Sequence, residues 1–375
     1  MVERRLDVTK VGGSIPSART TNHMITLGIE TSCDETALCL LETHEQEGIF
    51  EYKILGNIIN SQIDLHRKYG GVFPILAKRE HIRNLPILYT QLLKEARIDE
   101  KNIDNIAVTR GPGLEPALWT GIVFAKELHT KLNIPIIPVN HMEGHIFSGL
   151  FTSTDVASDF TKLKPISYPA LALLISGGHT EIIMVEKIGM YKVIGRTRDD
   201  ALGEAFDKVA RMLGLPYPGG PEIGKLAEKA RNENIQKNIT LPRPMIHSKD
   251  LDFSFSGLKT SVLYLLKTTG EITGNMRIEI SREFEDSVIE VLTTKMRIAL
   301  EEYECHSLII GGGVIANKHI RESFTTLSTE YTIPLYLPSQ GLTGDNALMI
   351  ALAGVLNPTI TKDPLNLTAQ GNLSL

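Results

Sequence analysis

Residues 25–42 have the sequence ITLGIETSCDETALCLLE, and residues 170–186 have the sequence ALALLISGGHTEIIMVE. In both stretches a short apolar run is followed by a tip of small and polar residues and then by a second apolar run. This order predicts two strand–turn–strand units. Because the two units share one plan and lie far apart along the chain, they indicate a duplicated architecture with two lobes.

Helical and strand patterns alternate around these two units. The patterns predict buried strands over 105–109, 135–139 and 307–310, and helices over 78–98 (despite Pro86), from Pro116 onward, and near 201–213, 257–267 and 278–302. Strands that alternate with helices are typical of α/β proteins, in which helices cover parallel or mixed sheets. Ligands of such folds bind at the carboxyl ends of strands, which is where the glycine-rich loops of this chain fall.

The composition is that of an ordinary globular chain. The 375 residues carry a net charge of -5, with 42% hydrophobic and 22% charged residues. This balance excludes a polybasic protein that holds nucleic acid by bulk charge alone. Three scattered cysteines argue against a disulfide framework, and no stretch approaches the roughly 20 apolar residues of a membrane span. We therefore expect a cytoplasmic protein that has no contact with a membrane.

The length predicts two domains or one large bilobal unit. Residues 1–23 lack an apolar core and directly precede Met24, so we expect a tail or a misassigned start there. The further segments that we expect are a first lobe over 24–150, a linker loop over 151–167, a second lobe over 168–343, and a C-terminal segment over 344–375 whose helix returns toward the first lobe.

The sharpest chemical signal is the sequence HMEGH at 141–145. Histidines at i and i+4 share one helix face and can chelate a single cation, although a pair of hydrogen-bonding histidines near a helix start is the alternative. Asn140 is the expected N-cap of this helix. A zincin protease has the pattern H-E-x-x-H, whereas here Glu143 stands one place later and off the metal face. Asp345 could supply a further ligand, or it could only cap the apolar helix that follows.

Polar and glycine-rich turns are further candidates for binding a ligand. The turn 176–180 (SGGHT) could gather backbone N–H groups around an anion, or it could be a plain hairpin turn. The triglycine 311–313 could let a flat ligand lie against the backbone, or it could only pack a helix tightly on a strand. Asp207 and the rigid turn 217–221 could frame a ribose or merely cap a helix. Neither the dinucleotide fingerprint nor a P-loop is present.

Taken together, nine stretches resemble one family, the tRNA threonylcarbamoyladenosine transferases. These stretches, in chain order from Leu27 to Ala351, are LGIETSCDETA, GGVFPILAKREHI, VTRGPGLEPAL, VNHMEGH, LLISGGHTEI, DDALGEAFDKVARMLGLPYPGGP, FSFSGLKT, GGGVIAN and LTGDNALMIA. The resemblance implies an α/β protein with the two-lobed actin-like, sugar-kinase-like ATPase fold, in which duplicated ribonuclease-H-like lobes surround a nucleotide cleft.

The resemblance also implies a reaction and roles for residues. The reaction would move a threonylcarbamoyl group from threonylcarbamoyl-AMP to the exocyclic amine of the adenosine next to the anticodon of tRNA, with release of AMP. His141, His145 and Asp345 would ligate one divalent metal, Fe²⁺ or Zn²⁺. Asp34 is the acid that we expect to be catalytic. The residues expected to bind the substrate are Leu174, Ile175, Ser176, Gly177, Gly178, Asp207, Gly220 and Asn317.

The implied partners are tRNA and, as in bacterial relatives, an accessory paralogue subunit and a small ATPase; a homodimer is implied if the chain is of the mitochondrial type. Many relatives carry a carboxylate where this chain has Gly224, which puts one ribose or substrate contact in doubt. The cations that could contact tRNA, unless they are only scattered surface charges, are Arg243, His247, Lys249, Lys259 and Arg277.

Two other functions stay open. An actin-fold ATPase or kinase acting on another substrate is disfavoured by the paired histidines, because such enzymes hold Mg²⁺ mainly through phosphates, carboxylates and water. A non-enzymatic accessory subunit is disfavoured by the presence of both histidines and Asp345.

Overall fold

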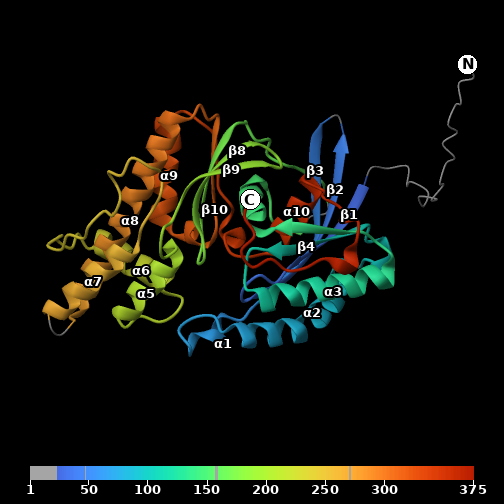
Figure 1. Ribbon diagram of the computed structural model, residues 1–375, viewed down its shortest axis with the longest axis horizontal. Coiled ribbons are helices and arrows are strands. Elements are labelled where there is room, and N and C mark those ends of the chain that lie inside the picture. The colour runs from blue at the N-terminus through green and yellow to red at the C-terminus, as the bar shows by residue number, and fades with distance from the viewer. Residues whose placement is uncertain (1–22, 47, 157–158, 270–271) are drawn as a thin grey trace, which may run out of the picture.

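The computed structural model describes residues 23–46, 48–156, 159–269 and 272–375, and it has two lobes, each built around one sheet (Figure 1). Apart from His23, the segment that we expected to be a tail or a misassigned start lies outside the described residues.

The first sheet has six strands in the order β5-β4-β1-β2-β3-β6. Its three longest strands form an antiparallel meander, and these are β1 (His23–Glu30), β2 (Glu35–Gln46) and β3 (Ile49–Ser61). The strands β4 (Asn105–Gly111) and β5 (Ile136–Asn140) extend the sheet in parallel from β1, and the short β6 (Thr161–Lys162) pairs with β3.

The second sheet repeats this plan in the order β11-β10-β7-β8-β9. Its antiparallel meander is β7 (Ala170–Ile175), β8 (Thr180–Lys187) and β9 (Met190–Arg196), and its parallel strands are β10 (Ser307–Gly311) and β11 (Leu335–Tyr336). Without β6 the two strand orders are identical, so the predicted duplication is confirmed.

Helices cover the outer faces of both sheets (Figure 1). On the first sheet they are α2 (Pro74–Ala96) and α3 (Glu115–Leu132), with the short α1 (Ile63–Arg67) before them. The second sheet carries a larger set, which is α5 (Leu202–Met212), α6 (Gly219–Asn232), α7 (Ser256–Thr269), α8 (Gly274–Glu302) and α9 (Lys318–Glu330).

Two further helices, α4 (His141–Phe147) and α10 (Ala347–Leu356), lie between the sheets. The period of two in β7 explains how this inner core forms, because successive side chains of a strand point to opposite faces. Leu171, Leu173 and Ile175 pack with α5 and α8, whereas Ala172 and Leu174 pack with α10 and with residues of the first sheet. The same apolar core therefore joins the two lobes.

Among the helices and strands of the described residues, those that were not predicted are β3, β6, β9, β11, α1 and α6. The prediction of a rigid turn over 217–221 is wrong at its end, because α6 begins at Gly219 and has Pro221 in its first turn, where proline is tolerated. The stretch 151–167, which we expected to be a linker, contains β6, and its Leu163 and Ile166 pack on the core between the sheets. Within the described ranges, no helix is both long and apolar enough to cross a bilayer.

Candidate metal centre and nucleotide cavity

The short helix α4 brings His141 and His145 together. Asn140 begins this helix, because its side chain accepts a hydrogen bond from the Met142 N–H at 2.9 Å, so the predicted N-cap is confirmed. The two imidazole ring centres lie 4.7 Å apart, and both side chains are buried. The spacing of i and i+4 therefore gives two nitrogen donors on one face.

Asp345 faces the two histidines from the start of α10. Its Oδ1 lies 3.3 Å from the Nε2 atom of His141 and 3.3 Å from the Nε2 atom of His145, and one donor atom from each of the three residues lies within 4.8 Å of the others. The alternative that Asp345 only caps α10 is wrong, because Asn346 is the cap and accepts a hydrogen bond from the Met349 N–H at 2.9 Å.

This donor set fits a divalent metal. Two imidazole nitrogens and a carboxylate oxygen are donors that Zn²⁺ and Fe²⁺ bind. Both ring nitrogens of His145 are buried and make no hydrogen bond among the described residues, which is rare for buried polar atoms. A metal ion at this position would give one of them a partner. Burial lowers the pKa of His145, and a neutral imidazole is the form that ligates metals.

Glu30 supports His141 from behind and was not among the predicted site residues. This fully buried carboxylate lies at the end of β1, where its Oε2 accepts hydrogen bonds from His141 Nδ1 at 3.0 Å and from Thr109 Oγ1 at 2.6 Å. A carboxylate behind a histidine fixes the tautomer, so that Nε2 faces the metal position. An acid that ends an otherwise apolar strand is the sequence signal that could have identified it.

The charged groups of this centre shift one another's pKa values. Burial alone would lower the pKa of His141, but Asp345 and Glu30 outweigh burial and raise it well above its usual range. Burial alone would likewise raise the pKa of Asp345 and of Glu30, and His141 outweighs it in both cases and lowers them. The imidazolium of His141 and the two carboxylates therefore stabilise one another without a metal. A divalent cation would displace the proton of His141 and would then balance the two carboxylate charges.

Glu143, in the same helix, points away from the metal centre as predicted. Its Oε1 accepts hydrogen bonds from the Tyr191 hydroxyl of β9 and, at 2.8 Å, from the Asn357 amide. Burial raises the pKa of this carboxyl group. Glu143 therefore ties α4 to the second lobe and to the segment after α10.

Asp34 lies in the turn between β1 and β2, two residues after Ser32, whose Oγ lies 3.3 Å from His141 Nδ1. It is 7% exposed, and its Oδ2 makes no hydrogen bond within the described part of the chain. Burial, followed by the charges of Asp34 and Asp345, raises the pKa of the neighbouring Glu35 well above its usual range. Burial also raises the pKa of the Cys33 thiol, so Cys33 is not poised to act as a nucleophile.

A cavity of about 670 Å³ lies in the second lobe, and this volume suits a nucleotide. Four of the residues predicted to bind the substrate line it: Gly177, Asp207, Gly220 and Asn317. Asp207 accepts a hydrogen bond from the Gly219 N–H at 2.6 Å and thereby holds the start of α6, and burial raises the pKa of its carboxyl group.

The other predicted substrate residues do not line this cavity. The side chains of Leu174 and Ile175 are fully buried in the cores on the two faces of β7. The Ser176 hydroxyl accepts hydrogen bonds from the N–H groups of Gly178 at 3.3 Å and His179 at 3.1 Å, so it shapes the turn. The cavity is also lined by Arg231, Glu285 and His319, which were not predicted because nothing in a helical pattern shows which polar residue faces a cavity.

The triglycine 311–313 connects the metal centre with the cavity. A Cβ atom at Gly311 would lie 2.6 Å from the carbonyl oxygen of His145, so the end of β10 packs directly against α4. Gly312 has a φ of 92°, which favours glycine, and Gly313 lines the cavity. The metal centre and the cavity are therefore immediate neighbours across this loop.

Two lobes of the same topology, with a His-His-Asp centre between them and a nucleotide-sized cavity beside it, define a protein of the actin-like ATPase fold class. The fold is similar to that of full-length HypF in its phosphate- and nucleotide-bound form, with a TM-score of 0.57, 13% identity, and coverage of 90% of this chain and 47% of that one. It is also similar to that of HypF from T. kodakarensis, with a TM-score of 0.55 and 12% identity over 92% of this chain and 49% of that one.

Within this class, the chain belongs to the family of tRNA N6-adenosine threonylcarbamoyltransferases, whose model matches residues 53–352. It is 44% identical to the tRNA N6-adenosine threonylcarbamoyltransferase of Thermosipho melanesiensis over 94% of this chain and 100% of that one. It is 46% identical to the protein of the same name from Polynucleobacter asymbioticus, over 89% of this chain and 92% of that one.

Proposed function

We propose that this chain transfers a threonylcarbamoyl group from threonylcarbamoyl-AMP to the exocyclic amine of the adenosine next to the anticodon in tRNA. The observation that carries this proposal is the nucleotide-sized cavity beside a His-His-Asp centre, in a chain whose relatives are named for threonylcarbamoyl transfer to tRNA. In the reaction the bond between the carbamoyl carbon and the phosphate oxygen breaks. A bond from that carbon to N6 forms, AMP leaves, and N6 gives up a proton.

The residues of the cavity would hold the AMP half of the donor. Gly177, Asp207, Gly220 and Asn317 line it from four different elements, which supports binding of one ligand among them. The carbamoyl group would then extend past the triglycine loop toward the metal centre. Holding donor and amine in one place lowers the entropic part of the barrier.

His141, His145 and Asp345 would hold one divalent cation, Fe²⁺ or Zn²⁺. When it is bound, such a cation supplies Lewis-acid polarisation of a carbonyl or phosphoryl oxygen. Glu30 would keep the imidazole of His141 in the required tautomer. Asp34, with one buried carboxylate oxygen that has no hydrogen-bond partner among the described residues, is the group that we propose accepts the proton from N6.

We also propose that α2 contacts a partner subunit. Ile75, Ile82 and Ile87 are 72%, 57% and 57% exposed on this helix, and the exposed rings of Tyr69 and Phe73 stack beside its start with their centres 5.6 Å apart. A cluster of exposed large apolar side chains is typical of a protein interface. The partner would be an accessory paralogue, working with a small ATPase, or a second copy of this chain.

The cations named as candidates for tRNA contact differ in their surroundings. Arg243 pairs with Glu283 and Glu290, and Lys259 pairs with Asp200, so their charges are already neutralised within the lobe. Arg277 donates to the carbonyl oxygen of Leu213 at 2.9 Å. We therefore propose that a partner subunit contributes to tRNA binding, and that the protein works in the cytoplasm on tRNA there.

The test is transfer of label from threonylcarbamoyl-AMP to unmodified tRNA, with and without a chelator and with and without accessory proteins. The expected result is a labelled modified adenosine whose formation stops on chelation. Turnover of ATP without any modified nucleoside would contradict the proposal and would favour an ATPase or kinase acting on another substrate.

A further inference from the structure

Position 224 in α6 carries no side chain, and this leaves a gap in the wall of the cavity. A Cβ atom at Gly224 would lie 3.2 Å from Asn317 Nδ2 and 3.6 Å from Glu285 Oε1. Gly224, Asn317 and Glu285 all line the cavity. Glu285 belongs to α8, and α8 packs against α6, which carries Gly224. The carboxylate of Glu285 therefore borders the space that a side chain at position 224 would fill.

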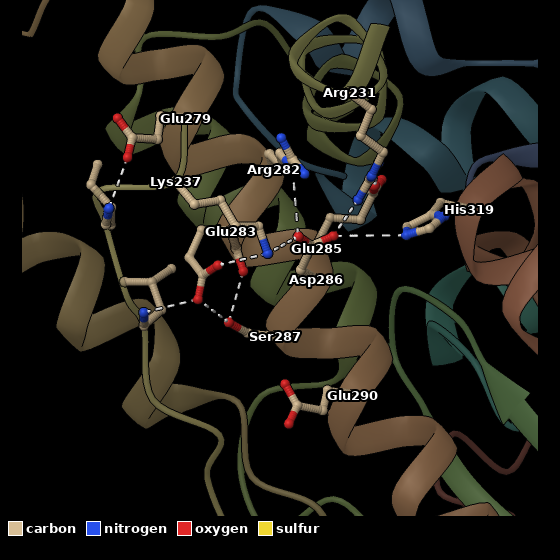
Figure 2. A network of polar contacts seen from close by, with 12 residues as sticks. Arg231, Lys237, Glu279, Arg282, Glu283, Glu285, Asp286, Ser287, Glu290 and His319 are labelled. Carbon is tan, nitrogen blue, oxygen red and sulfur yellow. Dashed lines mark hydrogen bonds and ion pairs between the residues drawn. The ribbon is translucent and has the colours of Figure 1, made fainter. Parts of the chain in front are cut away.

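Two hydrogen bonds fix the carboxylate of Glu285. Its Oε1 accepts from Asn317 Nδ2 at 2.5 Å, and its Oε2 accepts from the guanidinium of Arg231, which reaches across from α6 (Figure 2). A carboxylate has about four acceptor positions, so these two bonds leave capacity for ligand hydroxyls. Glu285 lines the cavity but is only 1% exposed, so a ligand hydroxyl would reach it over a small part of its surface that is shielded from bulk water.

Two hydrogen bonds also fix the side-chain amide of Asn317, and they allow it only one orientation. Its Oδ1 accepts from the Ile320 N–H at 3.0 Å, while its Nδ2 donates to Glu285. Because a backbone N–H only donates, the amide cannot be flipped without loss of the first of these bonds. Its second N–H is left to donate to a ligand, so Glu285 and Asn317 together offer an acceptor and a donor at one corner of the cavity.

We propose that Glu285 recognises the ribose of the nucleotide by accepting hydrogen bonds from its hydroxyl groups through the gap at Gly224. This inference rests on the proposed function, because the nucleotide in this cavity is itself proposed. A vicinal diol presents two donors, and a carboxylate that accepts from ribose hydroxyls is a recurring feature of nucleotide sites.

The other glutamates of the cavity wall suit this role less well. The side chains of Glu228 and Glu322 are 50% and 60% exposed, and Glu228 is paired with Lys318. Water competes with a ligand at such positions, whereas a buried carboxylate discriminates strongly between a ligand that donates to it and one that does not. A second carboxylate at position 224 would lie next to the carboxylate of Glu285, and two negative charges so close together repel each other. In this chain, therefore, the carboxylate comes from Glu285 of α8, and the residue of α6 that faces it is Gly224.

The inference is tested by calorimetric titration of the full-length protein with AMP and with 2′-deoxy-AMP and 3′-deoxy-AMP. Loss of a hydrogen bond to a buried charged group predicts that wild type prefers AMP to at least one deoxy analogue by about tenfold or more. In Glu285→Gln we expect this preference to fall below about threefold, while affinity for that deoxy analogue changes little. Glu290→Gln, the same change on the same helix but outside the cavity wall, is the matched control and should keep the preference.

Two variants at position 224 test the gap itself. Gly224→Ala leaves Glu285 in place but fills the gap, so it should weaken the preference for AMP even if Glu285→Gln does not fold. Gly224→Asp combined with Glu285→Gln moves the carboxylate from α8 to α6 and should restore the preference, whereas Gly224→Asp alone should weaken AMP binding through charge repulsion.

The outcomes separate this inference from the proposed function. If wild type transfers threonylcarbamoyl to tRNA and prefers AMP, and if both Glu285→Gln and Gly224→Ala keep that preference, the ribose role of Glu285 is wrong and the proposed function stands. If wild type binds no adenylate, both proposals fall.

Discussion

His141 has a carboxylate near each of its ring nitrogens, Glu30 at Nδ1 and Asp345 near Nε2. The two carboxylates differ in place and in role. Glu30 is fully buried behind the ring, whereas the Asp345 side chain is 21% exposed and also faces His145. We therefore expect loss of Glu30 to lower the affinity for a metal, and loss of Asp345 to abolish metal binding.

Removal of a ligand should abolish metal binding. We expect His141→Ala to reduce bound Fe²⁺ or Zn²⁺, measured by elemental analysis of the purified protein, from about one ion per chain to near zero, and to abolish most transfer. His44→Ala, at a partly exposed histidine that pairs with Glu51, is the control and should keep the metal. Full activity of His141→Ala would contradict the metal role.

Removal of the supporting carboxylate should have a weaker effect. Glu30→Gln keeps the size of the side chain but removes its charge, and loss of such a partner typically lowers metal affinity about 10- to 100-fold. A competition titration against a metal chelator would measure the change, and Glu42→Gln on β2 is the control. An unchanged dissociation constant in Glu30→Gln would show that His141 is oriented by other contacts.

Among the helices and strands, those that could be predicted have a sequence pattern that shows directly which of their residues are buried. The apolar runs of β1 and β7 end in polar tips, and the i and i+4 spacing in α4 sets its two histidines on one face. By contrast, the middle of β3 alternates between buried and partly buried residues, and β9 is mostly partly buried or exposed, so neither strand has the continuous apolar run of a buried strand. The role of Glu285 depends on a contact between α6 and α8 that no local pattern contains.

Gly219, the first residue of α6, should tolerate no side chain. A Cβ at Gly219 would lie 2.4 Å from Ala210 Cβ and 2.8 Å from Asp207 Cα, so Gly219→Ala would push α6 away from α5. Overpacking of this kind costs about 1–3 kcal/mol, and we expect a loss of that size in the free energy of unfolding measured with urea, together with weaker binding of AMP. Gly274→Ala is the control and should be neutral or slightly stabilising, because a Cβ at Gly274, at the start of α8, would meet no atom of the described residues within 4 Å. Equal stability of the two variants would show that α6 shifts without cost.

The helix α4 should also depend on its anchor in the second lobe. Tyr191→Phe removes the hydroxyl that donates to buried Glu143. An unsatisfied buried group costs about 1–3 kcal/mol, so the free energy of unfolding should fall by that amount, whereas Tyr69→Phe on the exposed surface should leave it unchanged. No loss in Tyr191→Phe would mean that Asn357 alone satisfies Glu143.

At the scale of the whole molecule, the lobes are joined by more than the chain that connects them. The inner core contains residues of both sheets together with α4 and α10. On the side of the cleft near α1, Arg67 Nε donates to the carbonyl oxygen of Tyr217 at 3.0 Å, and Arg211 donates to that of Gly70. The two lobes therefore contact each other in at least two places, in the inner core and near α1.

The exposed apolar surface of α2 should control assembly. Ile82→Asp places a charge in the middle of this surface and should shift the protein, with its accessory subunit or alone, to a smaller species in light scattering coupled to size-exclusion chromatography, without loss of the folded state. Ile360→Asp, at a residue with the same 57% exposure in the C-terminal segment, is the control. An unchanged mass in Ile82→Asp would place the interface elsewhere.

The position of α10 has a consequence for synthesis on the ribosome. Residues 347–354 of this helix are all buried, many of them in the core between the sheets, and Asp345 stands at the start of the same segment. A nascent chain that has already released both sheets therefore still lacks the helix that joins them and the third proposed ligand of the metal centre. Closure of the inner core, and binding of a metal by all three proposed ligands, can therefore occur only after translation has passed residue 356 and the segment has left the exit tunnel.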